Sequence, residues 1–183
     1  MGVVADIGRT WRHGPQAVVR EHVARGPGEG RAFGFLMIGS FLVVMAQLPS
    51  LARDAAAAAL GAPVATPLAR SLPPEFRTMD VMTAYTILPW LVIAPLVFYG
   101  LAFLAHSLSR LLSGQGTAFG ARVALFWSWL AATPLVLLTG LMAALAGPTA
   151  ANVTGILWIA AFAAFWWLSQ REASKAPENA HGA

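Results

Sequence analysis

A glycine-rich stretch, "SGQGTAFGARVALFW" from Ser113 to Trp127, is the part of the sequence whose residue types most suggest a site for chemistry. A dinucleotide-binding loop needs the pattern G-x-G-x-x-G between a strand and a helix, and a P-loop needs G-x-x-x-x-G-K followed by Ser or Thr. Here the spacing is Gly114-x-Gly116-x-x-x-Gly120, no lysine follows, and an apolar segment of helix length precedes it. Neither pattern for binding a nucleotide is met.

The same residues predict a turn between two helices that carries a weak anion site. Gly114 and Gly116 would end the first helix in backbone conformations that glycine adopts at low cost, and Thr117 would cap the second. Free amides at a helix start attract anions, and Arg110 and Arg122 flank this start. The candidate site for an anion or a lipid head group is Arg110, Gly116, Thr117 and Arg122.

Catalytic constellations are missing from the sequence. His106 lies near the end of an apolar segment, but a catalytic or metal-binding histidine needs partners, and the long apolar blocks contain no carboxylate. The pattern H-E-x-x-H is absent, no serine has the context of a nucleophile elbow, and there are no cysteines. We therefore expect a protein that is not an enzyme and that uses no metal or cofactor.

Composition places the chain among membrane proteins. Of its 183 residues, 57% are hydrophobic and 11% are charged, and the mean hydropathy is +0.64. A helix of about 20 apolar residues spans the hydrocarbon of a bilayer. Four blocks meet this length: Ala32 to Leu51, Val81 to about His106, Arg122 to Ala146, and Ala150 to Ser169. The prediction is an all-α, polytopic membrane bundle of about four transmembrane helices.

The flanks and the first loop complete the predicted organisation. Residues 1–30 form a basic amphipathic segment, 31–170 the transmembrane domain and 171–183 a tail. Apolar residues at near-helical spacing on either side of Gly14-Pro15 predict two short helices at a membrane surface; a partly disordered basic tail is the alternative. Between the first two spans, a loop at 52–80 contains the alanine run Ala55 to Ala59, which would form a short surface helix.

Basic residues predict the orientation in the membrane. If there are four spans, nine lysines and arginines fall on one side: Arg9, Arg12, Arg20, Arg25, Arg31, Arg110, Arg122, Arg171 and Lys175. Only Arg53, Arg70 and Arg77 fall on the other. The positive-inside rule then places both termini and the glycine turn in the cytoplasm, and Trp166 and Trp167 at the interface agree with this. Because the basic residues flank apolar blocks, we expect anionic lipid head groups, not nucleic acid, as the counter-charge.

Three prolines lie inside the predicted second and third spans. Pro89, Pro95 and Pro134 each free a backbone carbonyl one turn earlier in the helix. Transporters bind substrates at such breaks, so a pathway would involve these prolines with Tyr85 and Thr133. The plainer interpretation is a kink in each helix, with nearby threonines forming local hydrogen bonds.

Small residues four apart indicate close helix packing. The pairs are Gly140 with Ala144, Ala151 with Gly155, and Ala160 with Ala164. Such pairs let the backbones of two helices approach. In a chain this rich in alanine the same pattern also arises by chance.

Two long stretches resemble the bacterial branch of the Yip (Ypt-interacting protein) domain family: "GPQAVVREHVARGPGEGRAFGFLMIGSFLVVMAQLPSLAR" and "FYGLAFLAHSLSRLLSGQGTAFGARVALFWSWLAATPLVLL". The resemblance covers about 17–171. It is carried by the glycine turn with Phe119 and by a small residue that directly precedes Thr133 and Pro134 in the following helix. It implies a multi-span membrane protein with a cytoplasmic N-terminal segment. Five spans are usual in that family, whereas this sequence has four.

Three functions are compatible with these features. The first is a non-enzymatic protein of a bacterial inner membrane that scaffolds partners or organises lipid through a basic cytoplasmic face. A membrane-protein partner or a second copy of the chain would then be its ligand, together with anionic head groups. The alternative is a small transporter or channel subunit with a pathway near the proline-kinked spans. An intramembrane enzyme comes third.

Overall fold

The computed structural model describes residues 2–111 and 116–175, and every regular element within them is a helix. Four continuous helical runs are long and apolar enough to cross a membrane: Glu29–Ala59, Met79–Leu111, Ala118–Leu145 and Pro148–Ala173. The predicted all-helical architecture with four such helices is confirmed. Each run begins two to four residues before the apolar block that predicted it, and all but the third, which ends at Leu145, also continue past the end of their block.

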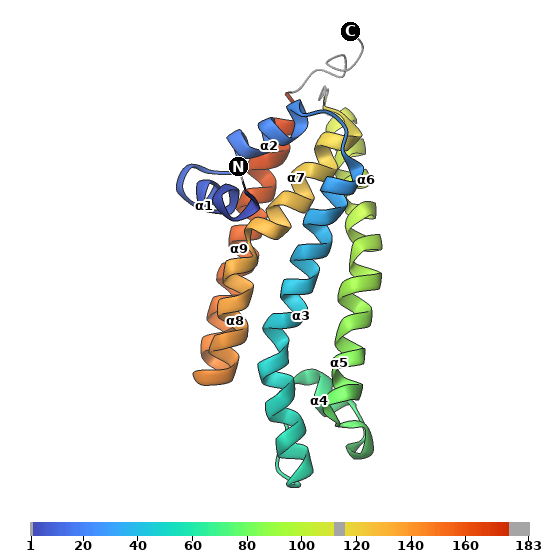
Figure 1. Ribbon diagram of the computed structural model, residues 1–183, viewed down its shortest axis with the longest axis vertical. Helices are drawn as coiled ribbons and strands as arrows, with labels where there is room; N and C mark the ends of the chain where they lie inside the picture. The colour runs from blue at the N-terminus through green and yellow to red at the C-terminus, as the bar shows by residue number, and fades with distance from the viewer. Residues whose placement is uncertain (1, 112–115, 176–183) are drawn as a thin grey trace. The chain divides into compact units, whose positions relative to one another are not determined.

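The elements follow one another as successive helices (Figure 1). They are α1 (Val3–His13), α2 (Gln16–Ala24), α3 (Glu29–Ala59), α4 (Pro67–Ser71), η1 (Pro74–Phe76), α5 (Met79–Ile87), η2 (Leu88–Ile93), α6 (Ala94–Leu111), α7 (Ala118–Ala131), α8 (Thr133–Leu145) and α9 (Pro148–Ala173). The chain divides into two compact units, which are described in turn. Unit 1 contains residues 1–39, 95–132 and 159–183, and unit 2 contains 40–94 and 133–158.

Helix α7 forms the core of unit 1. Every residue from Phe119 to Ala131 except Arg122 is buried. A helix that is apolar on all sides must be covered on all sides, and here α6 and α9 supply aromatic cover. The Trp129 ring lies 4.6 Å from that of Phe98 on α6 and 5.6 Å from that of Phe162 on α9. Ser128 and Ser169 also share a buried hydrogen bond of 3.0 Å.

The N-terminal segment forms the two helices that its sequence predicts, with the break at Gly14-Pro15. Both pack against α7 (Figure 1). The apolar side of α2, with Val18 and Val19 at 1% and 0% exposure, is buried in unit 1. The expectation that this side lies on a membrane surface is therefore wrong for α2, because protein contacts cover it.

Unit 2 contains a folded cap where the sequence indicated a loop at 52–80. The buried Asp54 carboxylate accepts hydrogen bonds of 2.8 Å from the backbone amides of Ala65 and Thr66 and a further bond from the Thr66 hydroxyl. Thr66 in turn caps α4 through the amide of Ala69. A small core of Leu51, Ala69, Leu72 and Met82 closes under this turn.

The alanine run is not a separate surface helix. Ala55 to Ala59 form the last turns of α3, and the chain turns at Gly61, whose φ of 66° favours glycine. Five alanines carry high helix propensity and no stop signal, so the helix continues through them. Pro49 also lies inside α3, in addition to the prolines that the sequence places in the second and third spans.

The proline-rich part of the second span departs from regular α-helix. Residues 88–93 form a π-helical segment between α5 and α6, with Pro89 near its start. In the third span, α7 ends at Ala131 and α8 begins at Thr133, so Pro134 occupies the first turn of a new helix. A first turn tolerates proline because its amides lack intrahelical partners.

The glycine turn is only partly as expected. Thr117 caps α7 by accepting a 3.0 Å hydrogen bond from the Gly120 amide, which confirms the predicted cap. Gly116 does not have a positive φ; a side chain there would meet the backbone of Ala173 and Ser174. Glycine is thus required at 116 by a close approach to the end of α9. Gly114 lies outside the described residues.

Candidate functional site

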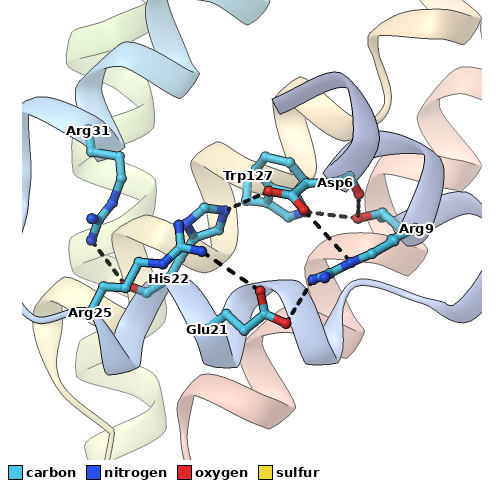
Figure 2. Close-up of polar contacts among 8 residues, drawn as sticks. Asp6, Arg9, Glu21, His22, Arg25, Arg31 and Trp127 are labelled. Atoms are coloured by element: carbon cyan, nitrogen blue, oxygen red, sulfur yellow. Dashed lines mark hydrogen bonds and ion pairs between the residues drawn. The ribbon is translucent and has the colours of Figure 1, made fainter. Parts of the chain in front are cut away.

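A buried polar junction joins α1, α2 and α7 within unit 1 (Figure 2). Asp6 and Thr10 are one helical turn apart on α1, so their side chains share a face, and both are buried, at 2% and 1% exposure. Thr10 donates to the Asp6 carbonyl at 2.9 Å and accepts from the Trp127 indole Nε1 at 3.1 Å. The Thr10 hydroxyl therefore links α1 to α7 through a hydrogen bond.

Arg9 connects two carboxylates across the junction. Its Nη2 donates to Glu21 on α2 at 2.9 Å, and its Nε lies 3.7 Å from Oδ1 of Asp6 (Figure 2). Arg25 approaches the other oxygen of Glu21 at 3.9 Å. The hydrogen bond from Arg9 is the largest influence on the pKa of Glu21 and lowers it.

His22 is the least expected member of the junction. The residue is 4% exposed, and its ring packs against those of Phe35 of α3, with ring centres 5.0 Å apart, and Trp127, at 5.2 Å. Its Nε2 is 4.0 Å from Oδ2 of Asp6, beyond hydrogen-bonding distance. Neither ring nitrogen makes a hydrogen bond within residues 2–111 and 116–175.

The surroundings of His22 favour its neutral form. Burial is the largest cause that lowers its pKa, and the positive charges of Arg25 and Arg31 lower it further, while Asp6 and Glu21 oppose them. A neutral imidazole fits an aromatic cage without an uncompensated charge. A protonated ring would be a buried positive charge, and the Asp6 carboxylate, 4.0 Å away, would compensate it only in part.

The junction is built to hold helices together. Asp6 and His22 together have the residue types of a general acid and base, but both are buried, so a reactant has no route to the pair in this arrangement. Among the described residues, no group of three or more His, Cys, Asp or Glu is placed to bind a metal ion. The polar atoms here make contacts between helices of the same chain.

The N-terminal helices make further contacts with unit 1 around the junction. Trp11 donates to the carbonyl of Ala131 at 2.8 Å and packs edge-on against Phe165 of α9 at 5.1 Å. Arg20 on α2 pairs with Glu172 on α9 at 2.6 Å. Helices α1 and α2 are therefore an integral part of this unit.

The junction should weaken in acid. Because the pKa of His22 in the folded protein is below its ordinary value of 6.5, the unfolded chain binds the proton more readily. The contribution of His22 to stability is then fully present above about pH 6.5 and is lost as the pH falls through the lower folded value. We expect the thermal midpoint of the detergent-solubilised protein to fall between about pH 7 and pH 5.

A matched pair of variants isolates this contribution. His22→Phe keeps a ring between Phe35 and Trp127 but removes the titrating group, so its thermal midpoint should change less over the same pH range. His13→Phe removes an exposed histidine at the end of α1 and should retain the wild-type slope. Equal slopes for wild type and His22→Phe would contradict the assignment to His22.

The residues of the predicted anion site are placed as follows. Arg110 lies in the last turn of α6, and Arg122 on α7 forms an ion pair with Glu29 at the start of α3. Gly116 and Thr117 line a cavity of about 10 Å³, together with His106 and Gln170. A space of this volume holds about one water molecule. The anion site stays a prediction. One of its two arginines, Arg122, is already paired with the Glu29 carboxylate.

The residues of the predicted pathway differ in their surroundings. Tyr85 is 57% exposed, Pro89 and Pro134 are exposed, and Pro95 and Thr133 are buried. Pro95 belongs to unit 1 and the other four to unit 2. Neither of the two cavities described for unit 1 includes any of the five.

No family model, curated protein or solved structure matches this chain. The class of protein is therefore defined by the fold itself. It is an all-helical chain with four helices long and apolar enough to cross a membrane, which supports a multi-pass membrane protein.

Proposed function

We propose that the chain is a non-enzymatic protein of the Yip type in a bacterial inner membrane, where it scaffolds partners or organises lipid through a basic cytoplasmic face. The observation that carries the proposal is the distribution of charge between the two compact units. Nine of the twelve lysines and arginines belong to unit 1, and unit 2 has only Arg53, Arg70 and Arg77. Under the positive-inside rule, the flanks of the spans that carry these nine basic residues are cytoplasmic.

Exposed apolar side chains support the membrane location. Large hydrophobic residues are exposed along α6 and α9, among them Leu96 at 78% and Ile156 at 68%. A soluble monomer seldom exposes apolar surface on this scale, whereas lipid chains cover it without cost. The N-terminal helices, by contrast, expose arginines such as Arg12 and Arg25, as expected for a surface that meets head groups or a partner.

A transporter or channel subunit is the alternative, and the π-helical segment at 88–93 favours it. Such segments often occur at functional sites, and here the segment follows Tyr85 and contains Pro89. Its exposed side chains would meet lipid or a second subunit before they met a solute. A scaffold therefore accounts for the exposure of this segment without a solute pathway.

Orientation is tested on the cysteine-free chain by single-cysteine labelling in intact cells. Leu60→Cys, at an 85% exposed position in unit 2, should react with a membrane-impermeant maleimide from outside. Arg12→Cys, in unit 1, should react only after the cells are permeabilised. The reverse pattern would overturn the cytoplasmic placement of the N-terminal helices.

The scaffold role is tested by mass spectrometry of proteins that co-purify with the full-length chain in mild detergent. Partners of the basic face should be lost with Arg12→Glu and retained with Arg70→Glu, a matched charge reversal in unit 2. A solitary monomer in every preparation would contradict the scaffold. Solute flux through vesicles that contain only this chain would favour the transporter.

A further inference from the structure

A groove of about 550 Å³ lies between α6 and α9 in unit 1. Its volume is in the range of sites that hold small organic ligands. Ala105 and Leu108 of α6 line one side, and Ala163, Trp166 and Trp167 of α9 line the other. None of these residues belongs to the polar junction or to the predicted anion site.

The groove changes from apolar to polar along its length. The polar residues Ser109, Gln170 and Arg171 follow the apolar ones in sequence on both helices. A helix rises about 1.5 Å per residue, so Arg171 lies roughly 12 Å along α9 from Ala163. An occupant of the whole groove must therefore have an apolar part and a polar end, which is the chemistry of a phospholipid.

Arg171 supplies the charge at the polar end. Its guanidinium lies over the Trp167 ring, 4.8 Å from the ring centre. The adjacent carboxylate, Glu172, is occupied by Arg20 at 2.6 Å and by Lys175 at 3.6 Å. Within residues 2–111 and 116–175, no carboxylate forms an ion pair with Arg171. A phosphate at this position would complement a cation that the fold holds in place.

The helices that form the groove favour lipid, not water, as its surroundings. Both helices belong to runs that are apolar and long enough to span a membrane, and Leu108 and Trp167 are 59% and 61% exposed. Tryptophans beside an arginine at a span end are typical of the interface between hydrocarbon and head groups. The apolar end of the groove thus adjoins acyl chains and its polar end adjoins phosphates.

From this geometry we propose that the groove between α6 and α9 binds one anionic phospholipid. An acyl chain lies along Ala105, Ala163 and Trp166, and the phosphate accepts hydrogen bonds from Arg171, with Ser109 and Gln170 as further donors. The inference rests on the proposed membrane embedding and does not depend on the scaffold role. A specific lipid at this site would hold the ends of the two helices together.

Native mass spectrometry of the full-length protein in detergent tests the site. The protein is titrated with phosphatidylglycerol or with phosphatidylcholine of the same acyl chains. We expect one phosphatidylglycerol to be retained in preference to phosphatidylcholine. R171Q should lower this preference about fivefold, in line with one basic charge near a membrane surface. A163W, which fills the groove from an exposed position, should lower retention of both lipids.

R70Q is the matched control, because it removes one exposed arginine of unit 2, outside the groove and outside the basic face, and should leave lipid retention unchanged. Equal retention by wild type, R171Q and A163W would overturn the proposal. Displacement of phosphatidylglycerol by millimolar inorganic phosphate would also overturn it, since only an anion site would remain. A dimer that A163W converts to a lipid-free monomer would show that a second copy occupies the groove. Loss of co-purifying partners with unchanged lipid retention would affect the scaffold proposal alone.

Discussion

Trp127→Ala is expected to release the N-terminal helices from unit 1 and to lower the free energy of unfolding by about 3–5 kcal/mol. The Trp127 side chain is fully buried, at 0% exposure, and its ring packs against those of His22 and Phe35. Its indole also donates to the Thr10 hydroxyl. Truncation leaves a cavity at the point where α1, α2 and α3 meet the core helix, and it removes the hydrogen bond between the Trp127 indole and Thr10.

Limited trypsin digestion in detergent gives a local measurement of this release. Cleavage after Arg12 and Arg20 should become faster in Trp127→Ala, and the thermal midpoint should fall. Trp127→Phe, which keeps an aromatic ring but loses the indole donor, should cost about 1–2 kcal/mol. Trp167→Ala removes a tryptophan that is 61% exposed and serves as the control. The same cleavage rate in Trp127→Ala and Trp167→Ala would contradict the role given to the junction.

Local signals in the sequence predicted the elements of this fold well. Apolar blocks of span length identified the four long helices, and Gly14-Pro15 separated α1 from α2. Thr117 was recognised as a cap because a threonine before an apolar helical run has few other uses. These features depend on neighbours within one or two turns, so a single sequence is enough to find them.

The polar junction could not be found in the same way. Thr10 and His22 contact Trp127, more than one hundred residues later in the chain, and hydropathy patterns contain no information on such distant pairs. His22 lies in the basic N-terminal segment, outside the four apolar blocks. Asp6 and Thr10 share a face of α1 at helical spacing, but a helix that lies on lipid also has a polar face, so this spacing does not predict their burial.

The end of α3 and the reason for glycine at position 116 also depend on contacts that the sequence does not reveal. Nothing between Leu51 and Ala59 tells a reader where α3 ends, since alanine favours helix wherever it occurs. The sequence predicts Gly116 as a residue of a left-handed turn. In the structure, glycine is required there because a side chain would meet the backbone of Ala173. Only the packing of α9 against the turn distinguishes these two causes.

Gly140→Ala is the prediction that tests packing in unit 2 most directly. The backbone of α8 at Gly140 approaches α3 so closely that a Cβ would collide with the carbonyl oxygen of Ala46. A backbone carbonyl cannot rotate away as a side chain would, so the helices must separate along their contact. Arg53 of α3, which donates to the carbonyls of Ala143 and Ala144 at 2.8 and 2.7 Å, would lose its alignment. Overpacking of this kind costs about 1–3 kcal/mol and more when the backbone must move.

Gly155→Ala is the matched control, because it makes the same substitution in a neighbouring helix where there is room. A Cβ at Gly155 would meet only the Thr139 methyl group at 3.7 Å, an ordinary contact. Alanine is a better helix former than glycine by about 1 kcal/mol, so Gly155→Ala should have the wild-type thermal midpoint or a higher one. Gly140→Ala should have a lower midpoint despite the same gain in propensity, and Gly140→Leu a lower one still. If both alanine variants were equally stable, α3 and α8 would not be in backbone contact at Ala46.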